Sequence, residues 1–294
     1  MRALLERGAP VRVFVRSPGK VSHLPPEVER AVGALEDREA VARALTGVHA
    51  AFYVSPHDAA EERLAGNFVS ECEREGVRLV FAGLHANGRN RLARLVQRTL
   101  FGLMLPHYRP KLRLAERIRT SRTNPVVLIP GNSYQMDEAC KDELLAGRSP
   151  LPLGLVPRVD TRDVGEAAAR ALLDPTVPSG GYSLVGPDSL GGRQTAAHWA
   201  AALGRPVTYT PDLGETDLIL ERAYSGRKVL DCQRSYRLGR VKMKTSPADL
   251  AQTTFLLGRP PRSHAEYARE VAAEWQAEHL APAHAGPRLT ATAS

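Results

Sequence analysis

The residues of this chain best suited to acid–base chemistry lie together in the stretch "PHYRPK", residues 106–111. His107 and Lys111 are four positions apart, which is one helical turn, so their side chains can face the same partner. Tyr108 precedes Lys111 by three positions, and the charge of a lysine lowers the pKa of a neighbouring group. Prolines on both sides leave the geometry of this turn open. The alternatives are a helix-capping or surface role for His107 and a place on a basic helix face for Lys111.

The same stretch lies inside a strongly basic segment. Residues 89–119 contain nine Lys or Arg and a single acid, Glu116, so their surplus equals the net charge of +8 of the whole chain. A charge concentrated in this way suggests an anionic ligand, a nucleic acid or a membrane surface. The alternative is a solvated basic helix face. No helix-turn-helix or zinc pattern supports direct reading of DNA, so we do not expect a nucleic-acid partner.

An apolar stripe runs through the first part of this segment. Leu92, Leu95 and Val96 share one helix face, with arginines around them, which would suit a membrane surface. Such a stripe more often packs into the protein's own core. We therefore rank the membrane role last and expect no membrane partner.

Composition is that of an ordinary soluble globular protein. The chain has 294 residues, of which 43% are hydrophobic and 24% charged. Its apolar runs are too short to span a membrane, and its start lacks the features of a signal peptide. The three cysteines are scattered, without CxxC spacing, so neither a metal site nor a disulfide framework is expected. These features favour a reducing cytoplasm.

Strand and helix patterns alternate in the first half of the chain. Short runs rich in β-branched residues predict strands at 11–16, 28–32, 49–56, 77–84 and 124–131. Helical spacing lies between them, at 38–47 and 59–76 and in two helices of the basic segment split by Pro106. This rhythm predicts an α/β fold with a doubly wound parallel sheet and right-handed crossovers.

The pattern is looser after about residue 132. We predict helices at 160–175, 193–204, 215–236, 247–258 and 264–276, with short strands at 180–186 and 207–211. The range 215–236 is predicted to be one long helix. The tail, 281–294, has no periodicity and is predicted to be disordered.

Several stretches together give the chain a family resemblance. They are "RALLERGAPVRVFVRSPGK", "LPHYRPKLRLAERIRTS" with its H-x-x-x-K pattern, "DTRDVGEAAARALLDP", "GGYSLVGPDSLGGRQTAAHWAAALGRPVTY" and "LLGRPPRSHAEYARE". In this order they resemble the NmrA-like family, atypical members of the short-chain dehydrogenase/reductase superfamily. The resemblance implies a Rossmann-like NAD(P)-binding domain over residues 1–135 and a small α+β substrate lobe over 136–280. It also implies a return helix at 160–174 that packs back on the sheet.

Members of that family begin with a strand and a G-x-x-G-x-x-G loop, which here would lie before Met1. The glycines of that loop let the backbone approach the pyrophosphate of the dinucleotide. The strand is normally central, so its two neighbours are expected to lose a ladder partner each. We expect Met1 not to be the true start. The alternative is a degenerate chain that no longer binds a dinucleotide.

Two basic residues point to the form of the cofactor. Arg16 ends the second strand of the family pattern, where an arginine accommodates the 2′-phosphate of NADP and a carboxylate would bind the ribose of NAD. Lys20 could add a second charge. The alternative is a solvent-facing basic turn. The resemblance places Ala34 and Leu35 near the adenine, with Ala34 in place of an acid.

Further cofactor contacts are expected where parallel strands end, because ligands bind at the carboxyl edge of such sheets. The residues at these ends are Val54, Ser55, Pro56, Ala82, Gly83, Pro130, Gly131 and Asn132. By resemblance, residues 130–133 cover the nicotinamide. Ordinary reductases of the superfamily carry a catalytic serine near residues 82–84, and this chain has none there.

These patterns predict an NADPH-dependent reductase of a small carbonyl or quinone-like substrate, with NADP(H) preferred over NAD(H). Its catalytic candidates are Lys111, His107 and Tyr108. The incomplete catalytic set leaves open whether the chain is an enzyme at all. The alternative is a non-catalytic regulator that senses NADP(H) and acts through protein or nucleic-acid contacts.

Overall fold

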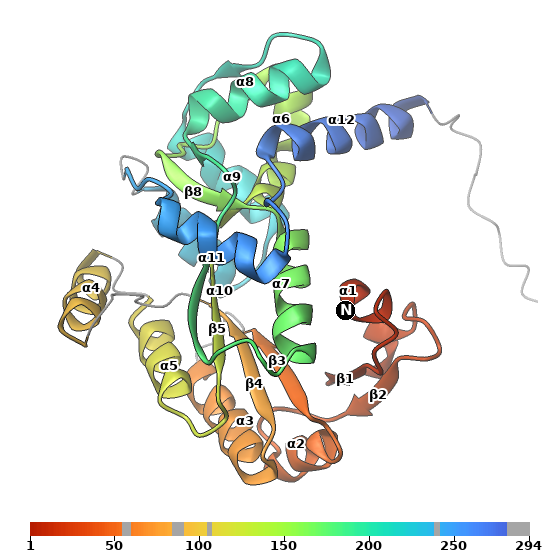
Figure 1. Cartoon of the computed structure of the whole chain (residues 1–294). Helices are drawn as coiled ribbons and strands as arrows, with labels where there is room; N and C mark the ends of the chain where they lie inside the picture. Colours follow the sequence, from red (N-terminus) through yellow and green to blue (C-terminus); the bar gives the residue numbers. More distant parts are fainter. Residues whose placement is uncertain (55–59, 84–90, 105–107, 238–241, 281–294) are drawn as a thin grey trace, which may run out of the picture.

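A parallel sheet forms the centre of the molecule, which we describe from a computed structural model (Figure 1). The structure describes residues 1–294 apart from 55–59, 84–90, 105–107, 238–241 and 281–294. The four strands lie in the order β3-β4-β5-β9, and each neighbouring pair is parallel. Their bounds are Ala50–Val54, Arg78–Ala82, Val126–Pro130 and Gly180–Leu184. The prediction of an α/β fold with a doubly wound parallel sheet is confirmed.

Both faces of this sheet are covered, as its unbroken apolar strands require. In β4, Leu79 and Phe81 pack into one core and Val80 and Ala82 into another, because successive side chains point to opposite faces. The first core also contains side chains of α2 (Arg38–Leu45), α3 (Glu61–Glu75) and α5 (Arg109–Arg119). The second contains side chains of α7 (Thr161–Leu173) and α11 (Pro247–Leu257).

Two further strands lie apart from this sheet. β1 (Arg12–Val15) and β2 (Glu29–Val32) form a parallel pair of their own, joined by the short helix η1 (Pro18–Val21). Within the described ranges, β1 pairs only with β2, and β3 pairs only with β4. This agrees with the expectation that two strands of the pattern each lack one ladder partner. Before β1, the short helix α1 (Arg2–Leu5) lies against α7.

The C-terminal half has a core of its own, built on aromatic rings. Trp199 and Trp275 stack with their centroids 4.9 Å apart, next to Tyr134 and Tyr267. The helices of this half are η3 (Tyr134–Cys140), α6 (Lys141–Leu145), α8 (Gly192–Leu203) and α12 (His264–Leu280) together with two described below. Its short strands are β6 (Asn132–Ser133), β7 (Arg148–Ser149), β8 (Val156–Val159), β10 (Ser189–Leu190) and β11 (Thr208–Tyr209).

One predicted helix is wrong. The range 215–236 holds two helices, α9 (Leu213–Ala223) and α10 (Arg227–Tyr236). Tyr224 is extended and Gly226 has a φ of 61°, a left-handed conformation that glycine adopts readily and that ends helical geometry. Apolar periodicity on both sides of "YSG" hid this break. The predicted disordered tail, 281–294, lies outside the described residues.

A second expectation fails at α4 (Arg91–Met104). Its apolar stripe was expected to enter the core, but Leu92, Leu95 and Val96 are 70%, 50% and 58% exposed. Figure 1 shows α4 at the edge of the molecule, beside α5, where the stripe has no core to enter.

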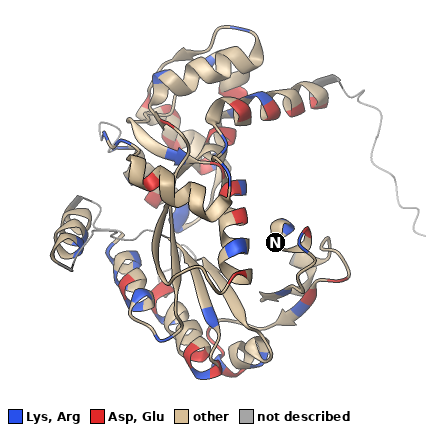
Figure 2. Ribbon diagram, in the orientation of Figure 1, with Lys and Arg blue, Asp and Glu red and all other residues tan. Residues whose placement is uncertain are grey.

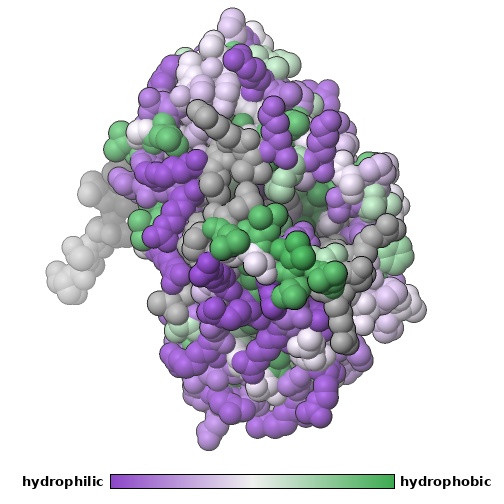
Figure 3. Space-filling model, turned by 90° about the vertical axis from the view of Figure 1, so that its left-hand side faces the viewer, coloured by the Kyte–Doolittle hydropathy of each residue, from purple (hydrophilic) through white to green (hydrophobic). Residues whose placement is uncertain are grey.

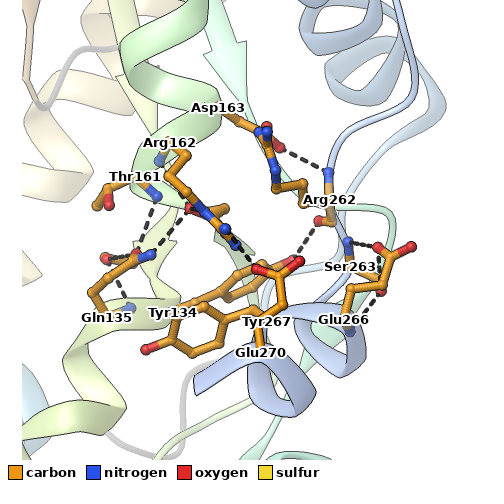
Figure 4. A network of polar contacts seen from close by, with 12 residues as sticks. Tyr134, Gln135, Thr161, Arg162, Asp163, Arg262, Ser263, Glu266, Tyr267 and Glu270 are labelled. Atoms are coloured by element: carbon orange, nitrogen blue, oxygen red, sulfur yellow. Dashed lines mark hydrogen bonds and ion pairs between the residues drawn. The ribbon is translucent and has the colours of Figure 1, made fainter. Parts of the chain in front are cut away.

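Polar contacts join the C-terminal half to the helix that covers the sheet (Figure 4). Arg162, in the first turn of α7, bonds to Asp160 and, across the interface, to Glu270 of α12. Gln135 of η3 donates to Asp160 at 3.0 Å, and the Tyr134 hydroxyl donates to the carbonyl of Arg262 at 3.3 Å. These contacts fix η3 and α12 against α7.

Candidate functional site

The candidate site lies at the carboxyl edge of the sheet. Each crossover helix between parallel strands must begin at the edge where the preceding strand ends. The N-terminal turns of α3 and α5 therefore lie near the ends of β3, β4 and β5. In open α/β sheets this edge is where ligands bind. The predicted Val54, Ala82 and Pro130 are the last residues of these three strands.

A buried ion pair joins the two helix starts. Lys111 Nζ lies 2.7 Å from Glu61 Oε2, and the two side chains are only 11% and 4% exposed. The parallel pair on the outer side, Arg113 with Glu62, is 2.6 Å apart but 62% and 44% exposed. A charge buried to the extent of Lys111 requires a partner, and Glu61 supplies it. Sequence reasoning selected Lys111 and missed Glu61.

Tyr108 lies just before α5, with its hydroxyl 3.4 Å from that of Ser235 on α10. Burial raises the pKa of Tyr108, the hydrogen bond with Ser235 acts in the opposite direction, and the nearby Asp231 and Glu61 add to the rise. The phenol therefore stays protonated at neutral pH. The sequence predicted that Lys111 would lower the pKa of a neighbouring group, but its charge is balanced by the carboxylate of Glu61.

The part of the cofactor site that was predicted to bind the adenosine is a short loop after β2. This loop packs against α3. Asn67 donates from Nδ2 to the carbonyl oxygen of Leu35 at 3.1 Å. A Cβ on Gly33 would lie 2.8 Å from the ring of Phe14, so the missing side chain lets this loop approach β1. Ala34 and Leu35 are half-buried here, and Arg16 is exposed directly after β1.

The part of the cofactor site that was predicted to contact the nicotinamide lies where β5 leads into β6. Pro130 and Asn132 are exposed, whereas Gly131 packs tightly: a Cβ there would lie 2.7 Å from the carbonyl oxygen of Pro157. The end of the neighbouring strand β4 is less exposed than the end of β5, because Ala82 is buried and Gly83 is half-buried. The residues named here, which the structure describes, thus offer backbone and small side chains rather than acids or bases.

Some predicted residues have no described placement. Ser55, Pro56 and His107 lie outside the described residues, and the side chain of Lys20 is not described. The structure therefore joins Lys111 and Tyr108 at one edge of the sheet without placing the third catalytic candidate.

These residues fit a dinucleotide in part. Arg16 carries the positive charge that a phosphate requires, and the loop of Ala34 and Leu35 gives an apolar surface for an adenine. Lys111 and Tyr108 lie at the carboxyl edge of the sheet. Lys111 has three N–H donors, so its bond to Glu61 leaves capacity for ribose hydroxyls. We assign none of the described residues to the pyrophosphate.

A second polar centre, missed in the sequence, lies in the core of the C-terminal half. Asp137 of η3 is bound by Arg158 at 2.7 Å, by His264 Nε2 at 2.8 Å and by Trp199 Nε1 at 3.0 Å. Burial raises the pKa of Asp137, but the charge of Arg158 and the bond from His264 outweigh it, and the pKa falls well below the ordinary value. Asp137 and His264 are far apart in sequence, so no spacing signal could have joined them.

His264 continues this centre toward the surface. Its pKa is lowered chiefly by burial, against the attraction of Asp137, so the ring is neutral at pH 7. A neutral His264 that donates from Nε2 to Asp137 must accept at Nδ1, where Nδ1 of His198 lies 3.0 Å away. The pKa of His198 is also lowered, first by burial and then by His264.

Comparisons with known proteins agree with this architecture. A sequence family described as NAD(P)H-binding matches residues 1–175. The chain is 25% identical over 292 residues to an NAD(P)H azoreductase of Xenophilus azovorans, with 94% of each chain covered. It is 27% identical over 286 residues to a (4-alkanoyl-5-oxo-2,5-dihydrofuran-3-yl)methyl phosphate reductase of Streptomyces griseus, covering 94% of this chain and 91% of the relative.

Among solved structures, an NADPH-dependent quinone oxidoreductase of Escherichia coli complexed with NADPH has the same fold. It superposes with a TM-score of 0.65 at 16% identity, over 92% of this chain and 95% of that one. The match of the family over more than half of the chain confirms the family resemblance noted in the sequence. The chain belongs to this NAD(P)H-binding family.

Proposed function

We propose that this chain is an NADPH-dependent reductase of a small carbonyl or quinone-like substrate. The observation that carries the proposal is the cluster of Lys111, Glu61 and Tyr108 at the carboxyl edge of the parallel sheet. The relatives named as an azoreductase and a phosphate reductase, and the quinone oxidoreductase with the same fold, support this reaction class.

In this proposal residues 1–135 hold the cofactor and residues 136–280 form the substrate lobe. Arg16 would bind the 2′-phosphate, the loop of Ala34 and Leu35 the adenine, and the start of β6 the nicotinamide. When bound, the cofactor supplies a hydride. Exposed cationic Arg16, with no carboxylate at its position, favours NADPH over NADH.

In this proposal the proton for the reduction comes from a side chain of the protein. Tyr108 holds its phenolic proton beside Ser235, and the pair of Lys111 and Glu61 fixes the start of the helix that carries it. A phenol with a raised pKa is a weak proton donor, because general-acid catalysis works best when the pKa is near the working pH. The site therefore suits an acceptor that needs little acid assistance, such as a quinone, better than a simple ketone.

The test is NADPH oxidation by the protein against a panel of quinones and ketones. We compare two neutralising double variants, Lys111→Met with Glu61→Gln and, as the matched control, Arg113→Met with Glu62→Gln. Loss of the buried pair should lower turnover by up to about a hundredfold, the effect of misplacing a reacting group by about 1 Å. The exposed control pair should change it little. Equal turnover in both double variants would show that the buried pair of Lys111 and Glu61 has no role in the reaction.

The second candidate function is a regulator that senses NADP(H) without turnover. It is favoured by the charge balance of Lys111 and the raised pKa of Tyr108, because they leave the described residues of this edge without a strong acid. Tight binding of NADPH measured by calorimetry, together with no oxidation by any quinone or ketone, would favour this function over the reductase.

A further inference from the structure

Helix α4 carries an apolar face that the described part of the molecule leaves exposed. Five large side chains recur at helical spacing along it and are between 50% and 70% exposed: Leu92, Leu95, Val96, Leu100 and Leu103. Figure 3 shows the side of the molecule on which α4 lies, and hydrophobic residues gather there among hydrophilic ones. A contiguous exposed apolar face of this kind marks a binding surface more often than a scattered set does.

The charge of α4 has one sign. The helix contains Arg91, Arg94 and Arg98 and no acid (Figure 2). On α5, three of the basic residues bond to carboxylates of the same molecule: Lys111 with Glu61, Arg113 with Glu62 and Arg119 with Glu116. α4 therefore carries three arginines and no acid beside its apolar face.

Two grooves lie between α4 and α5, and arginines line both. One, of about 530 Å³, is lined by Arg94, Arg98 and Arg119, with Glu116 bonded to Arg119. The other, of about 440 Å³, is lined by Arg98, Arg109 and Arg113. Guanidinium groups bind phosphate oxygens well, so these grooves suit anionic headgroups next to an apolar layer.

We propose that α4 and its two grooves form a docking surface for a membrane containing anionic phospholipids. An amphipathic helix with arginines and an apolar face lies in the plane of the membrane interface, where apolar side chains enter the acyl boundary and cations meet the headgroups. No helix among the described residues is long and apolar enough to cross a membrane, so the contact is one of lying on the surface. The proposal is independent of the reductase function.

The charges favour a membrane over two other occupants. A second copy would place the same arginine-bearing, acid-free helix against its twin, so like charges would meet around the apolar contact. A nucleic acid would satisfy the arginines but would leave the leucines in water. An anionic lipid surface satisfies both faces at once.

The experiment is flotation of the full chain with vesicles of phosphatidylcholine alone and of phosphatidylcholine mixed with phosphatidylglycerol. We expect binding to the anionic vesicles that weakens as salt is added. Leu92→Gln with Val96→Gln should weaken it at least about tenfold, because each substitution removes apolar area from the contact. The matched control is Leu218→Gln on α9, where the leucine is 68% exposed, and it should bind like the parent.

The cationic part is tested separately. Arg98→Gln should weaken binding about fivefold, the effect of one basic residue near an anionic surface. Arg43→Gln on α2, also at an exposed arginine, is the matched control and should bind like the parent. Circular dichroism of each variant checks that the fold is intact.

Three results would overturn the proposal. The first is equal flotation with neutral and anionic vesicles. The second is equal loss in the α4 variants and their controls. The third is no flotation at all, together with a mass by light scattering that falls from dimer to monomer in Leu92→Gln/Val96→Gln, which would assign this face to a second copy instead.

Discussion

At the scale of single residues, Arg16 gives the sharpest prediction. If it holds the 2′-phosphate, Arg16→Ser should weaken NADPH binding about tenfold or more, since a hydrogen bond to a charged group contributes about 1.5–3 kcal/mol. NADH, which lacks that phosphate, should bind as before. Arg43→Ser is the matched control, and calorimetric titration with both dinucleotides is the measurement. An equal loss for NADPH and NADH would mean that Arg16 acts on the fold rather than on the phosphate.

The residues of the site were predictable only where chemistry and local spacing coincide. Lys111 could be selected because it follows His107 by one helical turn, and Tyr108 because it lies in the same short stretch. Glu61 and Ser235 could not, because the crossover of the sheet and the packing of α10 bring them to the same edge from distant positions. Long-range pairing of this kind leaves no mark in the spacing of a single sequence.

At the scale of elements, the two ion pairs between α3 and α5 should differ strongly in their effect on stability. Glu61→Gln leaves Lys111 buried without its carboxylate partner and should lower the free energy of unfolding by about 3–5 kcal/mol. Glu62→Gln disrupts an exposed pair and should cost less than about 1 kcal/mol. Urea unfolding followed by circular dichroism measures both.

A rescue variant separates the charge from the packing in that comparison. Adding Lys111→Met to Glu61→Gln removes the unpaired charge while keeping a long side chain, so most of the lost stability should return. If the double variant is no more stable than Glu61→Gln alone, the cost comes from lost packing and not from the buried charge of Lys111.

Elements were predictable where one periodicity dominated and wrong where it continued across a break. The strands of the sheet were found because short runs rich in β-branched residues between turn signals, such as "PVVLIP", favour strands. The range 215–236 failed because the chain leaves helical geometry from Tyr224 to Gly226 while apolar spacing continues on both sides. The stripe of α4 failed for another reason: periodicity reveals an apolar face but not what covers it.

At the scale of the whole molecule, stability should depend on pH through the buried centre of Asp137, Arg158 and His264. A histidine whose pKa is lowered by folding binds fewer protons in the native than in the unfolded state. Its contribution is therefore complete above the unfolded pKa of about 6.5 and is lost as the pH falls below that value. Asp137 stays charged throughout this range because its own pKa is lowered. His198, which faces His264, titrates in the same sense.

We therefore expect the free energy of unfolding to fall as the pH is lowered from about 7 to about 5, a range that straddles the unfolded histidine pKa. The two tryptophans of the chain, Trp199 and Trp275, lie stacked in this core, so their fluorescence during urea unfolding reports on it directly. His264→Gln can still donate to Asp137 but cannot titrate, so its slope against pH should be shallower. His23→Gln, at an exposed histidine, should keep the slope of the parent. If the parent instead became more stable as the pH fell, His264 would be charged in the native state, and the neutral relay from His198 through His264 to Asp137 would be wrong.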